Sequence, residues 1–246
     1  RFTNSGWTYT FGESAIVKIP LAGTGTAEMD LAGNNVTGVV VNGDYAYVTS
    51  VGGAQQANGN PASKLEVFDI SGTAPSFLAE IDVSAIPNSF GGDFVDVAFV
   101  NNKAYVLAAH YNTAYSQYSY IVIQTTEADL QAGGFGTGAK YKTATVSPAS
   151  PCFALLPGEG NDLYLVDGVK FQSIDTSLDI DAAGALSTVK SAGDFANGTA
   201  TGYVINTAAM VIERTAATRG LAAAKASVTK IAKRLARPED LERKEK

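Results

Sequence analysis

Cysteine and histidine each occur once in the 246-residue chain, as Cys152 and His110. A single cysteine excludes an internal disulfide framework, and a single histidine excludes zinc sites built from several imidazoles. The chain also contains no Gly-x-Ser-x-Gly segment, so a hydrolase with a Ser-His-Asp triad is not indicated. We interpret Cys152, in the apolar segment PCFALL, as a buried thiol and His110 as a structural or loop residue.

Long hydrophobic runs are missing as well. No stretch approaches 18 consecutive apolar residues, so we expect no transmembrane segment. The chain starts at Arg1 with no signal peptide, and we therefore expect a processed chain, a fragment or the ordered part of a longer protein. Apolar residues make up 46% of the chain and charged residues only 17%, which indicates an ordered domain.

Basic residues are scarce until the end of the chain. Residues 1–213 hold 8 Lys and Arg against 20 Asp and Glu, a formal charge of −12, whereas residues 214–246 hold 10 against 4, a formal charge of +6. Nucleic-acid binding requires a basic footprint that neutralises phosphates. The acidic body is therefore not expected to bind nucleic acid.

A recurring aromatic phrase organises the rest of the sequence. It occurs at Tyr9, Tyr47, Tyr105, Tyr164 and Tyr203, with spacings of 38, 58, 59 and 39 residues. Each phrase is followed by a strand-like segment and, in three units, preceded by an apolar one. The segments NGD (42–44), NNK (101–103) and GND (160–162) supply residues that tolerate a positive φ in the turns between the first and second strands. The unit is predicted to be a meander of four short strands.

Four-stranded units that recur every 40–60 residues are typical of a β-propeller, in which each sheet buries its faces against neighbouring sheets. The sequence predicts an all-β fold of about five four-stranded blade units, as a partial or a complete ring. We place the propeller at 1–215, with units at about 1–33, 34–86, 87–148, 149–193 and 194–215. Because the first and last units look incomplete, the chain is either part of a larger ring or a ring of five small blades.

The second unit resembles the LVIVD-type repeat of secreted and cell-surface bacterial β-propellers. The matching segments are VNGDYAYV (41–48), LEVFDISGTAP (65–75) and FLAEIDVS (77–84). The third unit departs from the pattern at Gln124, where the repeat has an aspartate. The resemblance implies a propeller in an extracytoplasmic location, secreted, periplasmic or on the cell surface of a bacterium. It implies no catalytic residues.

Two longer loops suggest where a ligand would bind. Residues 51–63 and 111–118 are both expected to connect the second and third strands of their units, so they should emerge at the same end of the molecule. The second loop region contains four tyrosines that could stack on sugars or on a protein: Tyr111, Tyr115, Tyr118 and Tyr120. Their alternative role is packing within strands and loops.

The composition changes from residue 216 onward. Leu221, Val228, Ile231 and Leu235 recur at spacings typical of one helix face, and Lys and Arg occupy much of the remainder. We predict a basic C-terminal amphipathic helix over 216–246. It would cap a blade edge, dock on a partner or an acidic surface, or bind an anionic membrane or nucleic acid. A segment foreign to the propeller is a further alternative.

Carboxylates provide the remaining candidates. Asp175, Asp179 and Asp181 could bind Ca²⁺, although their spacing departs from the EF-hand pattern and polar turn residues are the simpler interpretation. No cofactor is otherwise expected. We therefore expect a non-enzymatic scaffold that binds a protein or a glycan. The alternative is a carbohydrate-active hydrolase or lyase with acidic residues at the mouth of the propeller, although no pair stands out among the 20 acidic residues of 1–213. Asp93 and Asp96 are expected either to line the centre of the ring or to end a strand.

Overall fold

The computed structural model describes residues 2–4, 7–9, 13–19, 28–52, 62–111, 117–146, 154–158, 160–166 and 170–191. The chain divides into two compact units, Arg1–Met210 and Val211–Lys246, and all described residues belong to the first. The expected fifth unit and the basic segment 216–246 lie outside the described residues. The C-terminal helix and its face at Leu221, Val228, Ile231 and Leu235 therefore stay predictions.

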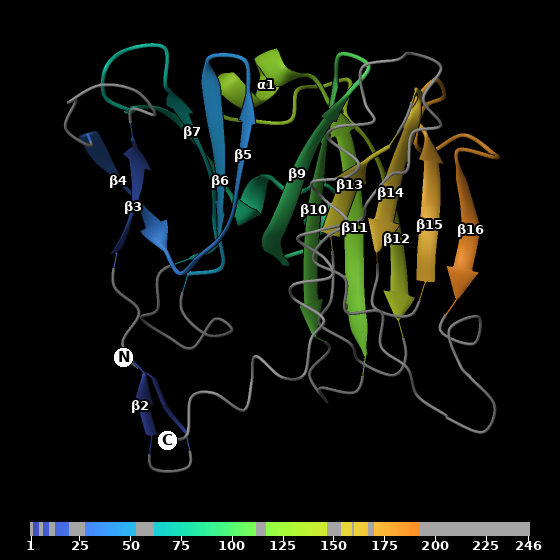
Figure 1. The fold of residues 1–246 in the computed structure, drawn as a ribbon. Helices are drawn as coiled ribbons and strands as arrows, with labels where there is room; N and C mark the ends of the chain where they lie inside the picture. Colours follow the sequence, from blue (N-terminus) through green and yellow to red (C-terminus); the bar gives the residue numbers. More distant parts are fainter. Residues whose placement is uncertain are drawn as a thin grey trace, which may run out of the picture. The chain divides into compact units, whose positions relative to one another are not determined.

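The described part of the chain is all-β, as the sequence predicts. Three sheets have four antiparallel strands in consecutive order, and two have two strands (Figure 1). The two-stranded sheets comprise β1 (Phe2–Asn4) with β2 (Trp7–Tyr9), and β3 (Glu13–Lys18) with β4 (Glu28–Asn34). The first four-stranded sheet comprises β5 (Val36–Asn42), β6 (Tyr45–Ser50), β7 (Lys64–Asp69) and β8 (Ser76–Asp82). The second comprises β9 (Asp93–Val100), β10 (Lys103–Tyr111), β11 (Tyr118–Thr125) and β12 (Lys140–Val146). The third comprises β13 (Ala154–Pro157), β14 (Asp162–Val166), β15 (Lys170–Asp175) and β16 (Leu186–Ser191).

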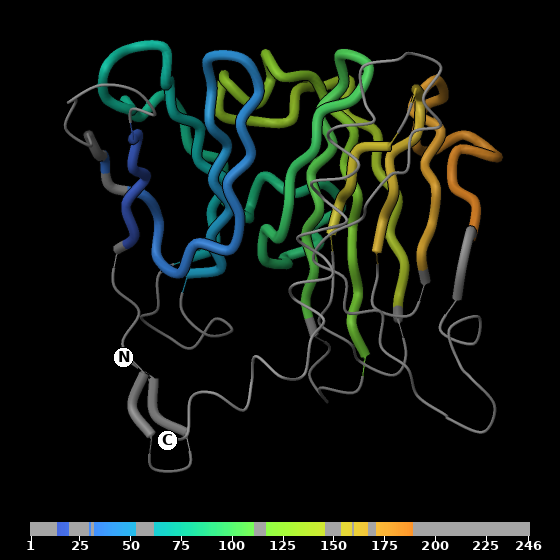
Figure 2. The backbone as a smooth tube through the Cα atoms, viewed as in Figure 1, coloured from blue at the N-terminus to red at the C-terminus, as the bar shows by residue number. Residues whose placement is uncertain are grey.

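The tight turns between first and second strands form where the sequence predicts them. Gly43, Asn101, Asn102 and Gly160 have positive φ angles of 56°, 52°, 59° and 62°. Glycine and asparagine adopt this left-handed conformation at low cost, and it matches the twist of a tight hairpin. We call the end of each sheet that carries these turns the turn end, and the opposite end the loop end. The smooth trace of Figure 2 shows the turns as sharp reversals of the chain.

Apolar side chains join the sheets in pairs, in sequence order. A small core between the β3–β4 and β5–β8 sheets contains Ile16, Ala32, Ala46, Val48 and Phe68. The core between the β5–β8 and β9–β12 sheets contains Tyr47, Leu65, Val67, Ile81, Ile86, Phe94, Val97, Ala104, Val106, Ala108, Ile121, Ile123, Leu130 and Phe135. The core between the β9–β12 and β13–β16 sheets contains Ala98, Tyr105, Leu107, Ala109, Tyr120, Val122, Leu155, Leu163, Leu165, Ile174 and Ile180. Each inner sheet is therefore covered on both faces by its neighbours.

The first strands of successive sheets lie close together. Strand β9 contacts both β5 and β13, and β6 also contacts β9. Side chains fasten these strands to their neighbours: the Ser63 hydroxyl accepts a hydrogen bond from the Phe94 amide at 2.8 Å, and the Asp96 carboxylate accepts one from the Leu155 amide at 2.8 Å. The first strands are thus held together by polar contacts as well as by the apolar cores.

One connection differs from the expectation. The sequence places most of the third unit's extra length in residues 111–118, but the β10–β11 connection spans only 112–117. The β11–β12 connection, 126–139, is longer and contains helix α1 (Glu127–Gln131). Thr126 caps this helix by accepting a hydrogen bond from the Asp129 amide, and Asp129 in turn accepts one from the Thr126 hydroxyl. Two 3₁₀ turns, Val83–Ala85 and Pro87–Ser89, connect β8 to β9.

Candidate functional site

The strand ends that border the two connections singled out by the sequence lie at the loop end, where Ser50 pairs with Lys64 and Tyr111 pairs with Tyr118. Residues 51–63 connect β6 to β7 and residues 112–117 connect β10 to β11. Tyr111 and Tyr118 are the last residue of β10 and the first of β11, and they face each other in the ladder. Tyr118 is half-buried and packs against the core between the β9–β12 and β13–β16 sheets. Tyr115 lies outside the described residues.

Tyr120 does not belong to the surface that the sequence suggests. Its side chain is only 3% exposed and lies in the core between two sheets. Its hydroxyl accepts a hydrogen bond from the Gln172 side-chain amide at 3.0 Å. Strand alternation explains the difference, because residues two apart on β11 share a face and this face is covered by the β13–β16 sheet. Tyr120 therefore contributes to packing and is not accessible for stacking on a ligand.

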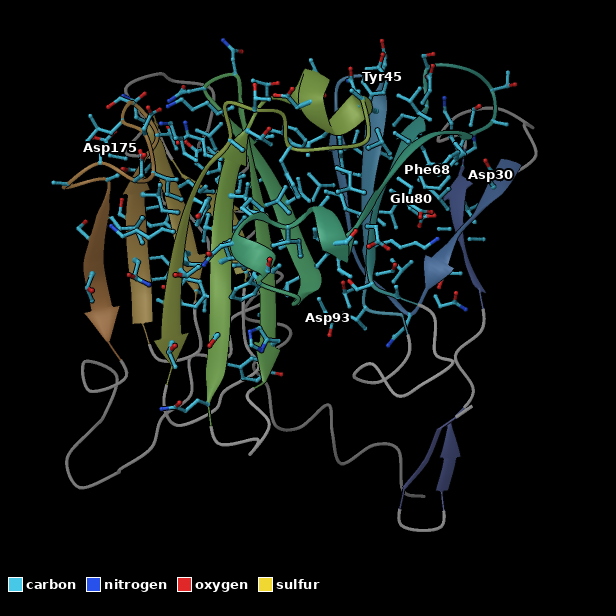
Figure 3. All side chains as sticks on the ribbon, turned by 180° about the vertical axis from the view of Figure 1, so that it is seen from behind. Asp30, Tyr45, Phe68, Glu80, Asp93 and Asp175 are labelled. Atoms are coloured by element: carbon cyan, nitrogen blue, oxygen red, sulfur yellow. The ribbon has the colours of Figure 1, made fainter. Side chains whose placement is uncertain are left out.

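A carboxyl group and an imidazole lie near each other at the loop end. Asp93 begins β9 and lies opposite Ala109 in the ladder, one residue before His110. Burial raises the pKa of the Asp93 carboxyl to about 6, and the charge of nearby His110 partly opposes this effect. The His110 ring packs edge-on against Phe90, with ring centres 4.7 Å apart. Figure 3 shows Asp93 at the opposite end of the sheets from Tyr45 and Asp175.

The backbone just before β9 passes close to the Phe90 ring and to Ala109. A Cβ atom at Gly92 would lie 2.6 Å from the Phe90 ring and 3.0 Å from the Ala109 backbone, so only glycine fits without displacement. Gly91, with a φ of 66°, precedes it. The Phe90 ring is thereby held next to His110. We call Phe90, Asp93 and His110 the loop-end cluster.

Asp96, the second acidic residue of β9, has a structural role. One of its oxygens accepts a hydrogen bond from the Leu155 amide and the other from the Val97 amide, both at 2.8 Å. Burial raises the pKa of this carboxyl, and the two amides act in the opposite direction. Because both oxygens bind backbone amides, we interpret Asp96 as a structural residue that holds β13 against β9.

The aspartates considered for Ca²⁺ lie at the turn end, and each interacts with protein groups. Asp175 accepts hydrogen bonds from the Ser177 amide and hydroxyl, which lower the pKa of its carboxyl. Asp179 accepts one from Gln124 at 2.9 Å, and Asp181 lies 3.5 Å from the Lys140 ammonium. Among the described residues, no group of three His, Cys, Asp or Glu side chains is arranged to hold a metal ion.

A lysine contact occurs twice in the same form. The Lys103 ammonium donates to the carbonyls of Thr176 and Leu178 at 2.9 and 3.0 Å, and the Lys18 ammonium donates to the carbonyls of Ile70 and Gly72. In both cases the two carbonyls come shortly after an aspartate whose carboxylate accepts a hydrogen bond from the amide of the serine two residues later. This aspartate is Asp175 in one sheet and Asp69 in the other. Each lysine therefore fastens the preceding sheet to the next one. The sequence offered no signal for this contact except the repeated Asp-x-Ser.

Comparison with known proteins does not add an identity. No family model matches the chain, and no curated protein matches it. The resemblance to the LVIVD-type repeat therefore stays a hypothesis. No helix among the described residues is long and apolar enough to span a membrane.

Proposed function

We propose that residues 1–215 belong to a β-propeller that acts as a non-enzymatic, extracytoplasmic binding scaffold, with its ligand surface at the loop end. The observation that carries the proposal is the serial stacking of four-stranded meanders with their first strands side by side. Stacked sheets of this kind form blades around an axis, and loops at one end of such a scaffold form a shared surface.

The loop-end cluster supports a binding role for this surface. The Phe90 ring packs against His110 near the Asp93 carboxyl, and the half-buried Tyr118 begins strand β11 on the face turned toward the β13–β16 sheet. Aromatic rings supply apolar contact area, and polar groups next to them orient a ligand. The ligand class proposed is a glycan or a protein segment that offers a sugar face or an aromatic side chain for stacking.

Glycan and protein-partner screening of the full chain tests this proposal. We expect Tyr118→Ala to weaken binding of any ligand found by about tenfold, since one lost stacking contact contributes ~0.5–1.5 kcal/mol in addition to the area it buries. Tyr141→Ala is the matched control, because Tyr141 is 39% exposed and lies on the same sheet toward the turn end. Equal losses in the two variants, or no loss in either, would contradict a ligand surface at the loop end.

An enzymatic function receives support from one observation only, the raised pKa of Asp93 beside His110. Glycoside hydrolysis usually needs a second carboxyl group across the scissile bond. Asp96, the nearest acidic residue on β9, is occupied by two backbone amides. Release of product from glycans at pH 6, abolished by Asp93→Asn, would favour the enzyme over the scaffold.

A further inference from the structure

Strand β10 reaches further toward the loop end than the equivalent strands of the other four-stranded sheets. It ends six residues after its aligned tyrosine, Tyr105, whereas β6 and β14 end three and two residues after theirs. The added part of β10 pairs with β11, where Ser119 lies opposite His110. Among the described strands, only the β9–β12 sheet therefore carries this extension at its loop end.

One face of the extended sheet changes from apolar to polar at the loop end. On β10, Val106 and Ala108 lie in the core with the β5–β8 sheet. Side chains alternate along a strand, so His110 lies on this same face. On β11, Ile121 lies in this core opposite Ala108, and Ser119 follows on the same face opposite His110. The apolar rows of the ladder are thus followed by a row of polar side chains.

Strand β12 continues this row to the edge of the sheet. Thr145 is the ladder partner of Ser119, and the two hydroxyl oxygens lie 3.3 Å apart, within hydrogen-bond distance. His110 and Ser119 are half-buried, and Thr145 is exposed. We call His110, Ser119 and Thr145 the polar row. Neighbouring strands lie about 4.8 Å apart, so the row spans roughly 10 Å across the sheet.

The chemistry of the polar row matches that of sugar hydroxyls. A serine or threonine hydroxyl both donates and accepts hydrogen bonds, and the two ring nitrogens of a neutral imidazole do so between them. Each sugar hydroxyl has the same dual character. The Asp93 carboxyl near His110 repels an anionic ligand once it is ionised. The half-buried Phe90 ring, packed against His110, adds apolar surface next to the row. Together these features favour a neutral glycan.

We propose that the polar row forms hydrogen bonds to the hydroxyl groups of a neutral glycan bound at the loop end. The roughly 10 Å length of the row is comparable to that of a disaccharide. This inference rests on the ligand surface proposed above and deepens it. It selects the glycan from the two ligand classes and assigns contacts to Ser119 and Thr145, on the face of β11 and β12 opposite to that of Tyr118.

Titration of the full chain with neutral oligosaccharides tests the inference. The probes are cellobiose, maltose, lactose and their longer homologues, and isothermal titration calorimetry measures the affinity. We expect the wild type to bind at least one of these probes. Ser119→Ala and Thr145→Val should each weaken this binding by about fivefold, the effect of losing roughly one neutral hydrogen bond. Thr145→Val preserves the shape of the side chain, so its effect reports on the hydroxyl group.

Thr143→Val is the matched control. Thr143 is exposed and lies on the same strand and face as Thr145, but its ladder partner is the apolar Ile121. This variant should bind the probes with wild-type affinity. Equal losses in the two valine variants, or no binding of any of these oligosaccharides to the wild type, would overturn the inference. A protein ligand whose binding is weakened by Tyr118→Ala and not by Thr145→Val would overturn the glycan assignment and leave the loop-end surface in place.

Discussion

Two tyrosines at equivalent positions should respond in opposite ways to loss of the hydroxyl group. Tyr47 and Tyr105 are both 0% exposed and both face the following sheet. The Tyr47 hydroxyl donates a hydrogen bond to the Glu127 carboxylate at 2.7 Å and accepts one from Gln131 at 3.4 Å. The Tyr105 hydroxyl is buried and has no hydrogen-bond partner within the described part of the chain. Burial raises the pKa of both phenols, so both are neutral at physiological pH.

The expected magnitudes follow from these contacts. A hydrogen bond to a charged group contributes about 1.5–3 kcal/mol, so Tyr47→Phe should lower the free energy of unfolding by roughly 2 kcal/mol. A buried hydroxyl without a partner is unfavourable, so Tyr105→Phe should leave the free energy of unfolding unchanged or raise it by up to ~1 kcal/mol. For a domain of this size, each kcal/mol shifts the melting temperature by about 2–4 °C.

Chemical denaturation of the wild type and both variants measures the difference directly, provided that the slope with denaturant stays constant. Glu127→Ala, alone and with Tyr47→Phe, completes a double-mutant cycle that isolates the Tyr47–Glu127 coupling. Equal losses in the two phenylalanine variants would refute the argument, because they would show that both hydroxyls have equivalent partners. A larger loss for Tyr105→Phe would refute it more strongly.

Three further variants test other contacts. Lys103→Met should lower the free energy of unfolding by about 1–2 kcal/mol through loss of its two carbonyl contacts, whereas Lys142→Met, at an exposed position of β12, should change it by less than ~0.5 kcal/mol in denaturation. Asp93 binds its proton more tightly in the folded state, so its contribution to stability falls as pH rises from about 4, its usual pKa, to about 6. Asp93→Asn should reduce this fall in the free energy of unfolding by about 1–2 kcal/mol. Identical plots of stability against pH for the wild type and the variant would contradict the assignment. Gly92→Ala should lower the free energy of unfolding by about 1–3 kcal/mol because the added Cβ would collide with Phe90 and Ala109. Gly134→Ala, which has open space around it, should be near neutral. An unchanged melting temperature for Gly92→Ala would show that the surrounding residues can move to make room for the added Cβ.

Much of the local structure could be predicted from the sequence because it depends on local rules. Alternating apolar residues in VTGVVVN and the turn residues at 42–44 give β5, its hairpin and β6, and the equivalent patterns give β9 and β10. Repetition then predicts that each unit is a consecutive meander, and the three four-stranded sheets have this order.

Helix α1 escaped prediction although a weak signal was present. Thr126 and Asp129 form a capping pair, but five helical residues are too few to show helical periodicity. The sequence predicts a surface position for Tyr120 because it indicates the strand but not the sheet that covers this strand. The Lys103 contact likewise depends on the distance between two sheets, which no pattern within one unit specifies. Contacts between units are therefore the part that the sequence leaves open.

Edge strands explain why the sheets need polar as well as apolar contacts. β5, β9 and β13 each lie at one edge of their sheet, so half of their backbone groups point away from the ladder. Side chains of the preceding sheet reach such groups: Ser63 binds the Phe94 amide, Thr49 donates to the Val95 carbonyl, and Asp96 binds the Leu155 amide. Apolar contact alone permits two sheets to slide, whereas a hydrogen bond to one backbone group fixes their register. These polar contacts therefore add to the apolar cores in fixing the position of each sheet relative to the next.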